Sequence, residues 1–140
     1  MHTRIKITLL RQSQPLREYP LDAPARCVVG RSHDCTIQVP LIEEFADVSR
    51  RHCRLEIEPD LVRVRDLRSA NGTYVNGAMI GRRAPSLDVA AAQALEDSEA
   101  VLDSAGEIRL GRGARLIVEF VAVAEESVRD MQTVVVKPAR

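Results

Sequence analysis

Four short groups of polar residues between positions 30 and 77 carry the side chains best suited to chemistry. They are Gly30-Arg31-Ser32, Ser49-Arg50-Arg51-His52, Asn71-Gly72-Thr73 and Asn76-Gly77. Together they offer guanidinium groups, hydroxyls, an imidazole and side-chain amides, with no carboxylate among them. Such donors suit a dianionic oxygen group, such as a phosphate, held by charge-assisted hydrogen bonds. The amide of Asn71 could also pair with the backbone of an extended peptide.

Signatures of catalysis or of metal binding are missing from the sequence. There is no nucleophile elbow, HExxH or P-loop, and Gly111-Arg112-Gly113 lacks the third glycine of a dinucleotide fingerprint. The cysteines are odd in number, form no CxxC and lie in apolar, strand-like stretches, which predicts buried reduced thiols at Cys27, Cys35 and Cys53. The histidines have no ligand spacing with them. We therefore expect no enzyme, no cofactor and no metal.

Composition places the chain among ordinary globular proteins. It has 140 residues, of which 45% are hydrophobic and 29% charged, which fits a single domain. Lys plus Arg and Asp plus Glu are both 20, which argues against nucleic-acid or acidic-membrane binding because both need a basic excess. No apolar run could span a membrane, and the first residues lack the apolar core of a signal peptide. We therefore expect a cytoplasmic protein.

The first half of the chain shows the pattern of short β-strands. Apolar and polar residues alternate around Ile5 to Leu9 and through His52–Glu58, as in half-buried strands. Asn76-Gly77 between two β-rich triplets predicts a hairpin, because these residues tolerate the positive φ angles of a type I′ turn. Other expected strands are Leu16–Tyr19, Arg26–Gly30, Thr36–Val39, Leu61–Val64, Ile108–Leu110 and Ala114–Val123, with Pro15, Pro20, Pro24 and Pro40 interrupting the early ones. This arrangement predicts an all-β sandwich or barrel.

Two segments depart from this pattern. Residues 86–104 contain five alanines and five acidic residues but no basic residue. Asp88 could N-cap a helix from Val89 to about Leu95, since alanine, glutamine and leucine favour helices. We interpret residues 86–104 as an acidic, partly helical insertion within a domain of residues 1–123. Residues 124–140 follow the last strand and are interpreted as a C-terminal tail.

The order and spacing of three motifs resemble the forkhead-associated (FHA) domain over about residues 3–121. The motifs are Gly30-Arg31, Ser49-x-x-His52 and Asn71-Gly72-Thr73-Tyr74-Val75-Asn76-Gly77. The resemblance implies a β-sandwich of about eleven strands whose loops at one end bind phosphothreonine peptides, without catalysis. One position departs from the family pattern. Ala70 stands where many members have Ser or Thr, so one hydroxyl contact to the ligand is missing.

By the same resemblance, four residues would contact the phosphopeptide. Arg31 would bind the phosphate or the peptide beside it, and Ser49 would donate its hydroxyl to a phosphate oxygen. Arg50 would add positive charge from the same loop, and Asn71 would hydrogen-bond the peptide backbone. The supporting residues would be His52, which pins the loops, Gly30 and Gly72, which allow their turns, and the structural hairpin Asn76-Gly77.

The predicted function is a phosphothreonine-dependent adaptor in bacterial-type Ser/Thr kinase signalling. Its partners would be phosphothreonine-containing proteins and a Ser/Thr protein kinase, with no nucleic acid and no membrane insertion. The alternative is a phosphate-independent assembly module that docks a partner through its sheet face or the acidic insertion. Thr133, which precedes three valines, is a candidate phosphorylation site. Once phosphorylated, it could occupy the binding site of its own chain or of a second copy.

Overall fold

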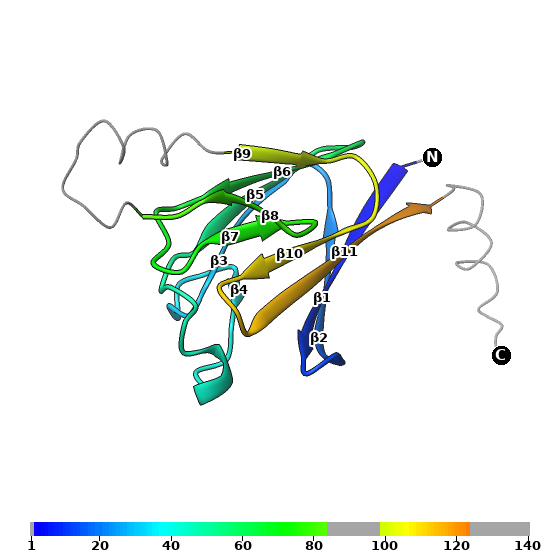
Figure 1. Cartoon of the computed structure of the whole chain (residues 1–140). Helices are drawn as coiled ribbons and strands as arrows, with labels where there is room; N and C mark the ends of the chain where they lie inside the picture. Colours follow the sequence, from blue (N-terminus) through cyan, green and yellow to red (C-terminus); the bar gives the residue numbers. More distant parts are fainter. Residues whose placement is uncertain (1, 84–98, 124–140) are drawn as a thin grey trace, which may run out of the picture.

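Two β-sheets pack face to face in the computed structural model, which describes residues 2–83 and 99–123 (Figure 1). The strands are β1 (His2–Arg11), β2 (Gln14–Asp22), β3 (Ala25–Gly30), β4 (Ile37–Gln38), β5 (Cys53–Ile57), β6 (Val62–Asp66), β7 (Thr73–Val75), β8 (Ala78–Gly81), β9 (Glu99–Leu102), β10 (Gly106–Leu110) and β11 (Ala114–Val123). The all-β sandwich prediction is confirmed. Among the described residues, the only helical element is a single 3-10 turn, η1 (Glu43–Phe45), and no helix could cross a membrane.

The sheets enclose one apolar core. The larger sheet has the strand order β2-β1-β11-β10-β7-β8, and the smaller has β4-β3-β5-β6-β9. The alternation seen in the sequence sets the inward faces: Ile5, Ile7 and Leu9 of β1 are fully buried, and β5 and β6 alternate between buried and half-buried residues. Phe45 of η1 is also fully buried in this core, so the β4–β5 connection is anchored to it.

Two prolines do not interrupt a strand as expected. Pro15 and Pro20 both lie within β2. β2 is an edge strand of the larger sheet, where a missing backbone N–H donor is tolerated because one side of the strand has no neighbour. Whether a proline interrupts a strand therefore depends on whether that strand lies at the edge of its sheet. The local sequence does not reveal this position.

The end of the expected acidic insertion is a strand. Glu99–Leu102 form β9, which pairs with β6 so that Leu102 lies opposite Val62 and Ala100 opposite Val64. This pairing and the burial of Leu102 place the segment in the smaller sheet, which the interpretation as an insertion did not predict. The predicted helix from Val89 to about Leu95 and the predicted tail, residues 124–140 with Thr133, lie outside the described residues.

Four connections meet at one end of the sandwich, which we call the loop end. They are residues 31–36, 39–52, 67–72 and 111–113. Backbone hydrogen bonds join them: Arg31 donates to Ser49 at 3.1 Å, and Gly111 donates to Gly72 at 2.9 Å. The start of β1 and the end of β11, where His2 pairs with Val123, lie at the opposite end (Figure 1).

Candidate functional site

Arg31 is the first residue after β3, and the neighbouring β4–β5 connection holds its side chain in place. Its Nε donates to the carbonyl of Val48. Its backbone carbonyl accepts a hydrogen bond from the Gln38 amide at 3.1 Å. Within the described residues the structure gives no partner to its two terminal nitrogens. Arg31 is half-buried, so it presents these two donors from a fixed stem.

Gly30 is required by a close backbone approach. A Cβ at this position would lie 2.1 Å from the Arg50 carbonyl oxygen and 2.9 Å from that of Ser49. Gly30 is the last residue of β3, directly before the connection of residues 31–36. A side chain here would push the segment that carries Ser49 away from Arg31.

Ser49 and Arg50 leave their side chains available on a fixed backbone. The Ser49 Oγ accepts a hydrogen bond from the Ala70 N–H at 3.0 Å, so its own hydroxyl hydrogen can still be donated to a ligand. The carbonyl of Arg50 accepts from the Ser32 N–H at 2.9 Å and from the Cys35 thiol at 3.2 Å. The Arg50 side chain is exposed, with no partner given within the described part of the chain.

Arg51, in contrast, is used within its own surroundings. It forms an ion pair with Asp34, which also accepts a hydrogen bond from the Ser32 hydroxyl at 2.6 Å. The Ser32 hydrogen bond and the charge of Arg51 lower the pKa of Asp34. The negative charge of Asp34 is therefore matched by Arg51, while Arg31 and Arg50 keep their charge for an external anion.

His52 joins two connections of the loop end from inside the protein. Its ring is fully buried. Nδ1 accepts a hydrogen bond from the Ser49 N–H at 3.0 Å, and Nε2 lies 2.8 Å from the Gly72 carbonyl oxygen. Because an N–H only donates and a carbonyl only accepts, these partners require a neutral ring with its hydrogen on Nε2. His52 thus fixes the backbone positions of Ser49 and Gly72 from the interior of the protein.

The free energy of unfolding is expected to fall as the pH drops below about 6.5, because of His52. Burial lowers the pKa of His52 in the folded protein. Stability is therefore complete above the unfolded-state pKa and is lost as the pH falls toward the folded-state pKa, with a slope of at most about 1.4 kcal/mol per pH unit. Urea unfolding across this pH range measures the slope.

The exposed His33 provides the matched control for this experiment. His33→Gln should keep the wild-type slope, and His52→Gln should lose most of it. A His52→Gln protein with the wild-type slope would show that another group causes the pH dependence.

A buried carboxylate that the sequence analysis missed organises the β6–β7 connection. Asp66 accepts hydrogen bonds from the Ser69 N–H at 3.1 Å, the Ser69 hydroxyl at 2.6 Å and the Thr73 hydroxyl at 2.6 Å. Ser69 Oγ in turn accepts from the Gly72 N–H at 3.0 Å. None of these side chains reaches solvent appreciably. The network shapes the turn at Gly72, whose φ of 95° favours glycine.

Asn71 lies exposed on this turn, and a second missed residue fixes its position. Its Nδ2 donates to the carbonyl of Asp47 at 2.8 Å, so its side-chain oxygen remains available to a peptide N–H. The Asp47 carboxylate accepts from the Arg112 N–H at 2.5 Å. A Cβ on Gly111 would lie 2.6 Å from that carboxylate. Asp47 therefore ties together three of the four connections at the loop end.

Asn76 and Gly77 lie at the other end of β7, away from the loop end. Their φ angles are 50° and 87°, as expected for the predicted type I′ turn. The Asn76 Oδ1 accepts a hydrogen bond from the Glu107 N–H at 2.9 Å. This turn therefore fastens β7 to β10.

The cysteines are buried and unpaired, as the sequence indicated. Burial raises the thiol pKa of Cys27 and of Cys53. No cluster of three His, Cys, Asp or Glu side chains that could hold a metal ion occurs in residues 2–83 and 99–123.

Comparison with known proteins relates part of the chain to one protein family. Residues 27–89 match the family model of the FHA domain. Over this stretch the chain is similar to an FHA domain. FHA domains are protein-interaction modules, and they generally bind phosphothreonine. The match covers Arg31, Ser49, His52 and Asn71, which the structure places at one end of the sandwich.

Similar proteins agree with this fold. A stretch of 74 residues, 53% of the chain, is 32% identical to the proliferation marker protein Ki-67 of Mus musculus and spans 2% of that protein. The FHA domain of the CT664 protein from Chlamydia trachomatis matches 85% of this chain and 99% of its own, with a TM-score of 0.65 and 21% identity. A chain from a structural and functional analysis of phosphothreonine-dependent FHA domain interactions matches 86% of this chain and 99% of its own, with a TM-score of 0.62 and 26% identity.

Proposed function

We propose that this FHA domain is a phosphothreonine-dependent adaptor in Ser/Thr kinase signalling that recruits phosphorylated proteins. The observation that carries the proposal is the joint presentation of Arg31, Ser49 and Asn71 by connections that are bonded to one another. The two terminal nitrogens of Arg31 and the Ser49 hydroxyl are donors for phosphate oxygens. The Asn71 oxygen can accept from a peptide backbone, and the exposed Arg50 adds charge.

The proposal is tested by comparing one peptide in its phosphothreonine, phosphoserine and unmodified forms. Calorimetry should detect binding of the phosphothreonine form and none of the unmodified form. A pull-down from lysate, with and without phosphatase treatment, tests the same dependence on whole proteins. If the captured proteins are unchanged by phosphatase, the domain is a phosphate-independent assembly module.

Ser49→Ala is expected to lower phosphopeptide affinity about tenfold or more, because one hydrogen bond to a charged group contributes about 1.5–3 kcal/mol. The variant also removes the acceptor for the Ala70 N–H, so a small loss of stability should accompany it. Calorimetry with the phosphothreonine peptide measures the first effect, and thermal unfolding measures the second. Ser104→Ala, at an exposed serine between β9 and β10, should bind like wild type. Unchanged affinity in Ser49→Ala would remove this hydroxyl from the site.

We also propose that phosphorylation of Thr133 regulates the adaptor through the same site. The proposal rests on chemistry: a phosphothreonine followed by Val134, Val135 and Val136 is a ligand of the type this domain is proposed to bind. A chain phosphorylated at Thr133 should bind external phosphopeptide more weakly or should form dimers. If it stays monomeric with unchanged affinity, Thr133 is no ligand of the domain.

A further inference from the structure

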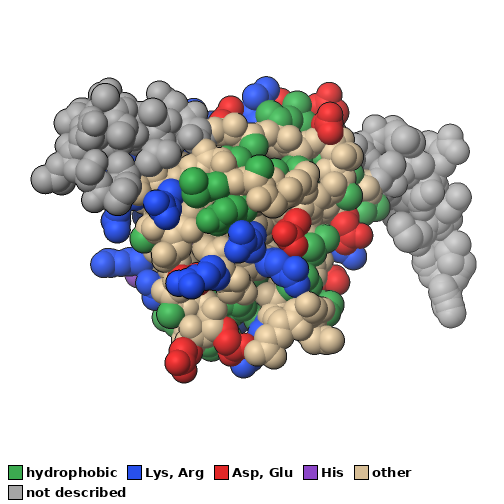
Figure 2. All heavy atoms as spheres, in the orientation of Figure 1, with side chains coloured by type: hydrophobic (Ala, Val, Ile, Leu, Met, Phe, Trp, Pro, Cys, Tyr) green, Lys and Arg blue, Asp and Glu red, His purple; other side chains and the backbone are tan. Residues whose placement is uncertain are grey.

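Three arginines gather on the β10–β11 hairpin beside the loop end. Arg109 of β10 lies directly opposite Arg115 of β11 in the sheet register, and Arg112 lies in the turn between the two strands. Figure 2 shows Lys and Arg side chains gathered on the visible face over β10 and β11. Like charges placed opposite each other on neighbouring strands are destabilising. The protein nevertheless concentrates positive charge here.

These side chains stand on the solvent face of the larger sheet. The strand pairings put Tyr74, Arg109, Arg115 and Leu10 in one row across β7, β10, β11 and β1, and directly paired residues share a face. Ile108 and Leu116, one residue away along the strands, are buried in the core. The Arg109 guanidinium lies 4.1 Å from the centre of the Tyr74 ring, which holds it in place against the sheet.

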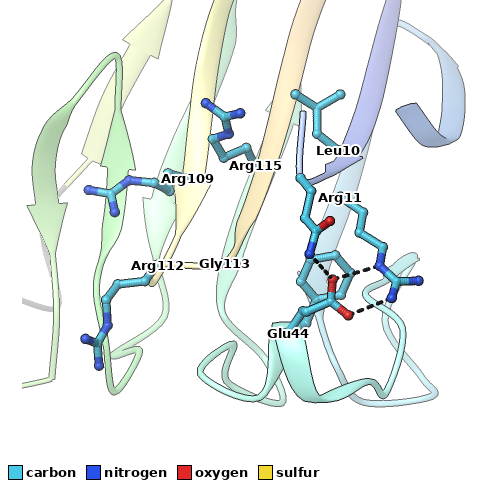
Figure 3. Close-up of a pocket in the computed structure, with 9 residues that line it drawn as sticks. Leu10, Arg11, Glu44, Arg109, Arg112, Gly113 and Arg115 are labelled. Atoms are coloured by element: carbon cyan, nitrogen blue, oxygen red, sulfur yellow. Dashed lines mark hydrogen bonds and ion pairs between the residues drawn. The ribbon is translucent and has the colours of Figure 1, made fainter. Parts of the chain in front are cut away.

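A pocket of about 460 Å³ opens among these residues. We call it the arginine pocket; it is lined by Leu10, Arg11, Gln12, Glu44, Phe45, Arg109, Arg112, Gly113 and Arg115. In Figure 3 the guanidinium groups of Arg109, Arg112 and Arg115 point away from Glu44, which faces Arg11 on the other side. Two hydrogen bonds, of 2.8 and 2.7 Å, join Arg11 to Glu44. The acidic lining residue is therefore neutralised by Arg11.

Among the described residues, only one of the other three arginines pairs with an acidic side chain. Arg115 lies 3.4 Å from Glu107 and donates to the Ser13 hydroxyl at 2.9 Å. Arg109 donates to the Gly111 carbonyl at 3.1 Å, which carries no net charge. Arg112 is exposed, and the described residues give its side chain no partner. The donors of these three arginines outnumber the one carboxylate that pairs with their side chains in the described part of the chain, that of Glu107, and such a surface favours an anion.

The arginine pocket adjoins the proposed phosphopeptide site. The Arg112 N–H bonds to the carboxylate of Asp47, and the carbonyl of Asp47 accepts from Asn71. Asp47 thus links the turn that carries Arg112 to Asn71, whose side chain is proposed to hold the peptide backbone. A peptide that is bound at Asn71 can extend into the pocket without leaving the surface.

We propose that the arginine pocket is a second anion-binding site, which takes a phosphoryl or carboxylate group on the same protein segment that places its phosphothreonine at the loop end. This inference rests on the proposed function for its first contact. It predicts that preferred partners carry an acidic or second phosphorylated residue at a fixed distance from the phosphothreonine. A single peptide segment then binds the arginines of the phosphothreonine site with one anion and those of the arginine pocket with the other.

The test uses three sets of peptides with the same phosphothreonine. In one set the flanks are neutral; in the others a glutamate pair or a phosphoserine is moved stepwise along either flank. Calorimetry compares wild type with the double variant Arg112→Gln/Arg115→Gln. The control is Arg26→Gln, at an exposed arginine of the other sheet. At the optimal position the added anion should raise wild-type and control affinity about tenfold. The double variant should bind all peptides as wild type binds the neutral one.

The proposal of a second anion-binding site is overturned if neither anion raises wild-type affinity at any position. It is also overturned if the double variant keeps the increase in affinity. If glutamate and phosphoserine both raise the affinity, the pocket accepts carboxylate and phosphoryl groups alike. If only one of them raises the affinity, the pocket is specific for that group. Nuclear magnetic resonance with the acidic peptide lacking phosphothreonine tests the pocket by itself. Shifts at Arg115 without shifts at Ser49 support it even if the proposed function fails. No shift at Arg109, Arg112 or Arg115 overturns it.

Discussion

Arg31→Ala is expected to weaken phosphothreonine-peptide binding by about 30-fold or more, because losing one partner of a hydrogen-bonded charge pair costs about 2–5 kcal/mol. The Val48 carbonyl fixes Nε, so the guanidinium group is already held in place and loses little entropy on binding. Fold stability should fall by no more than about 1–3 kcal/mol, since only the side-chain bond to the Val48 carbonyl is lost. The bonds from Arg31 to Ser49 and from Gln38 to Arg31 use the Arg31 backbone. Calorimetry gives the affinity, and thermal unfolding checks the fold.

Two further variants sharpen this result. Arg31→Lys should also bind weakly, because an ammonium group cannot bond to Val48 and still present a planar pair of donors. Arg26→Ala removes an exposed arginine that pairs with Glu56 and should bind like wild type. An Arg31→Ala dissociation constant within about threefold of wild type, less than the effect of one ordinary hydrogen bond, would exclude Arg31 from the site.

Asp66→Ala is expected to lower the free energy of unfolding by about 3 kcal/mol or more, because each buried polar group left without a partner costs about 1–3 kcal/mol. The substitution strands the Ser69 N–H, the Ser69 hydroxyl and the Thr73 hydroxyl, all of which bond to this carboxylate. Chemical denaturation measures the loss. Because the network shapes the Gly72 turn, peptide affinity should fall as well.

The control for Asp66 is Asp60→Ala, at an exposed aspartate in the turn before β6. It should change stability by less than about 0.5 kcal/mol, as most exposed substitutions do. Asp66→Asn should lie between the two, since an amide keeps the shape and one acceptor oxygen. If Asp66→Ala costs no more than Asp60→Ala, the network is not what holds the β6–β7 connection.

Local patterns were sufficient to predict most of the strands and one turn. The alternation around Ile5 and Leu55 marks inward faces, and both residues are fully buried. Asn76-Gly77 adopts two positive φ angles, as its residue types require. Arg31, Ser49 and Asn71 were found through their order and spacing, and the structure places them on connections that are bonded together.

Features that depend on distant partners could not be predicted in this way. Glu99–Leu102 was interpreted as part of an insertion, and its pairing with β6 places it in the sheet. Asp47 acts through Asn71 and Arg112, which are remote in sequence. Asp66 did leave a signal: it follows Val62 and Val64 at an inward position of β6. An acidic residue at such a position indicates a buried hydrogen-bond network.

The pairing of His2 with Val123 has a consequence for how this domain can be joined to others. The described chain enters and leaves the sandwich on adjacent strands, at the end opposite the loops (Figure 1). The described residues at which a linker would be joined therefore lie away from the recognition surface. Two tethered copies could engage one doubly phosphorylated partner, and the second contact would benefit from a high effective concentration. Such avidity can exceed the affinity of one domain by about 10²–10⁴ without any new contact.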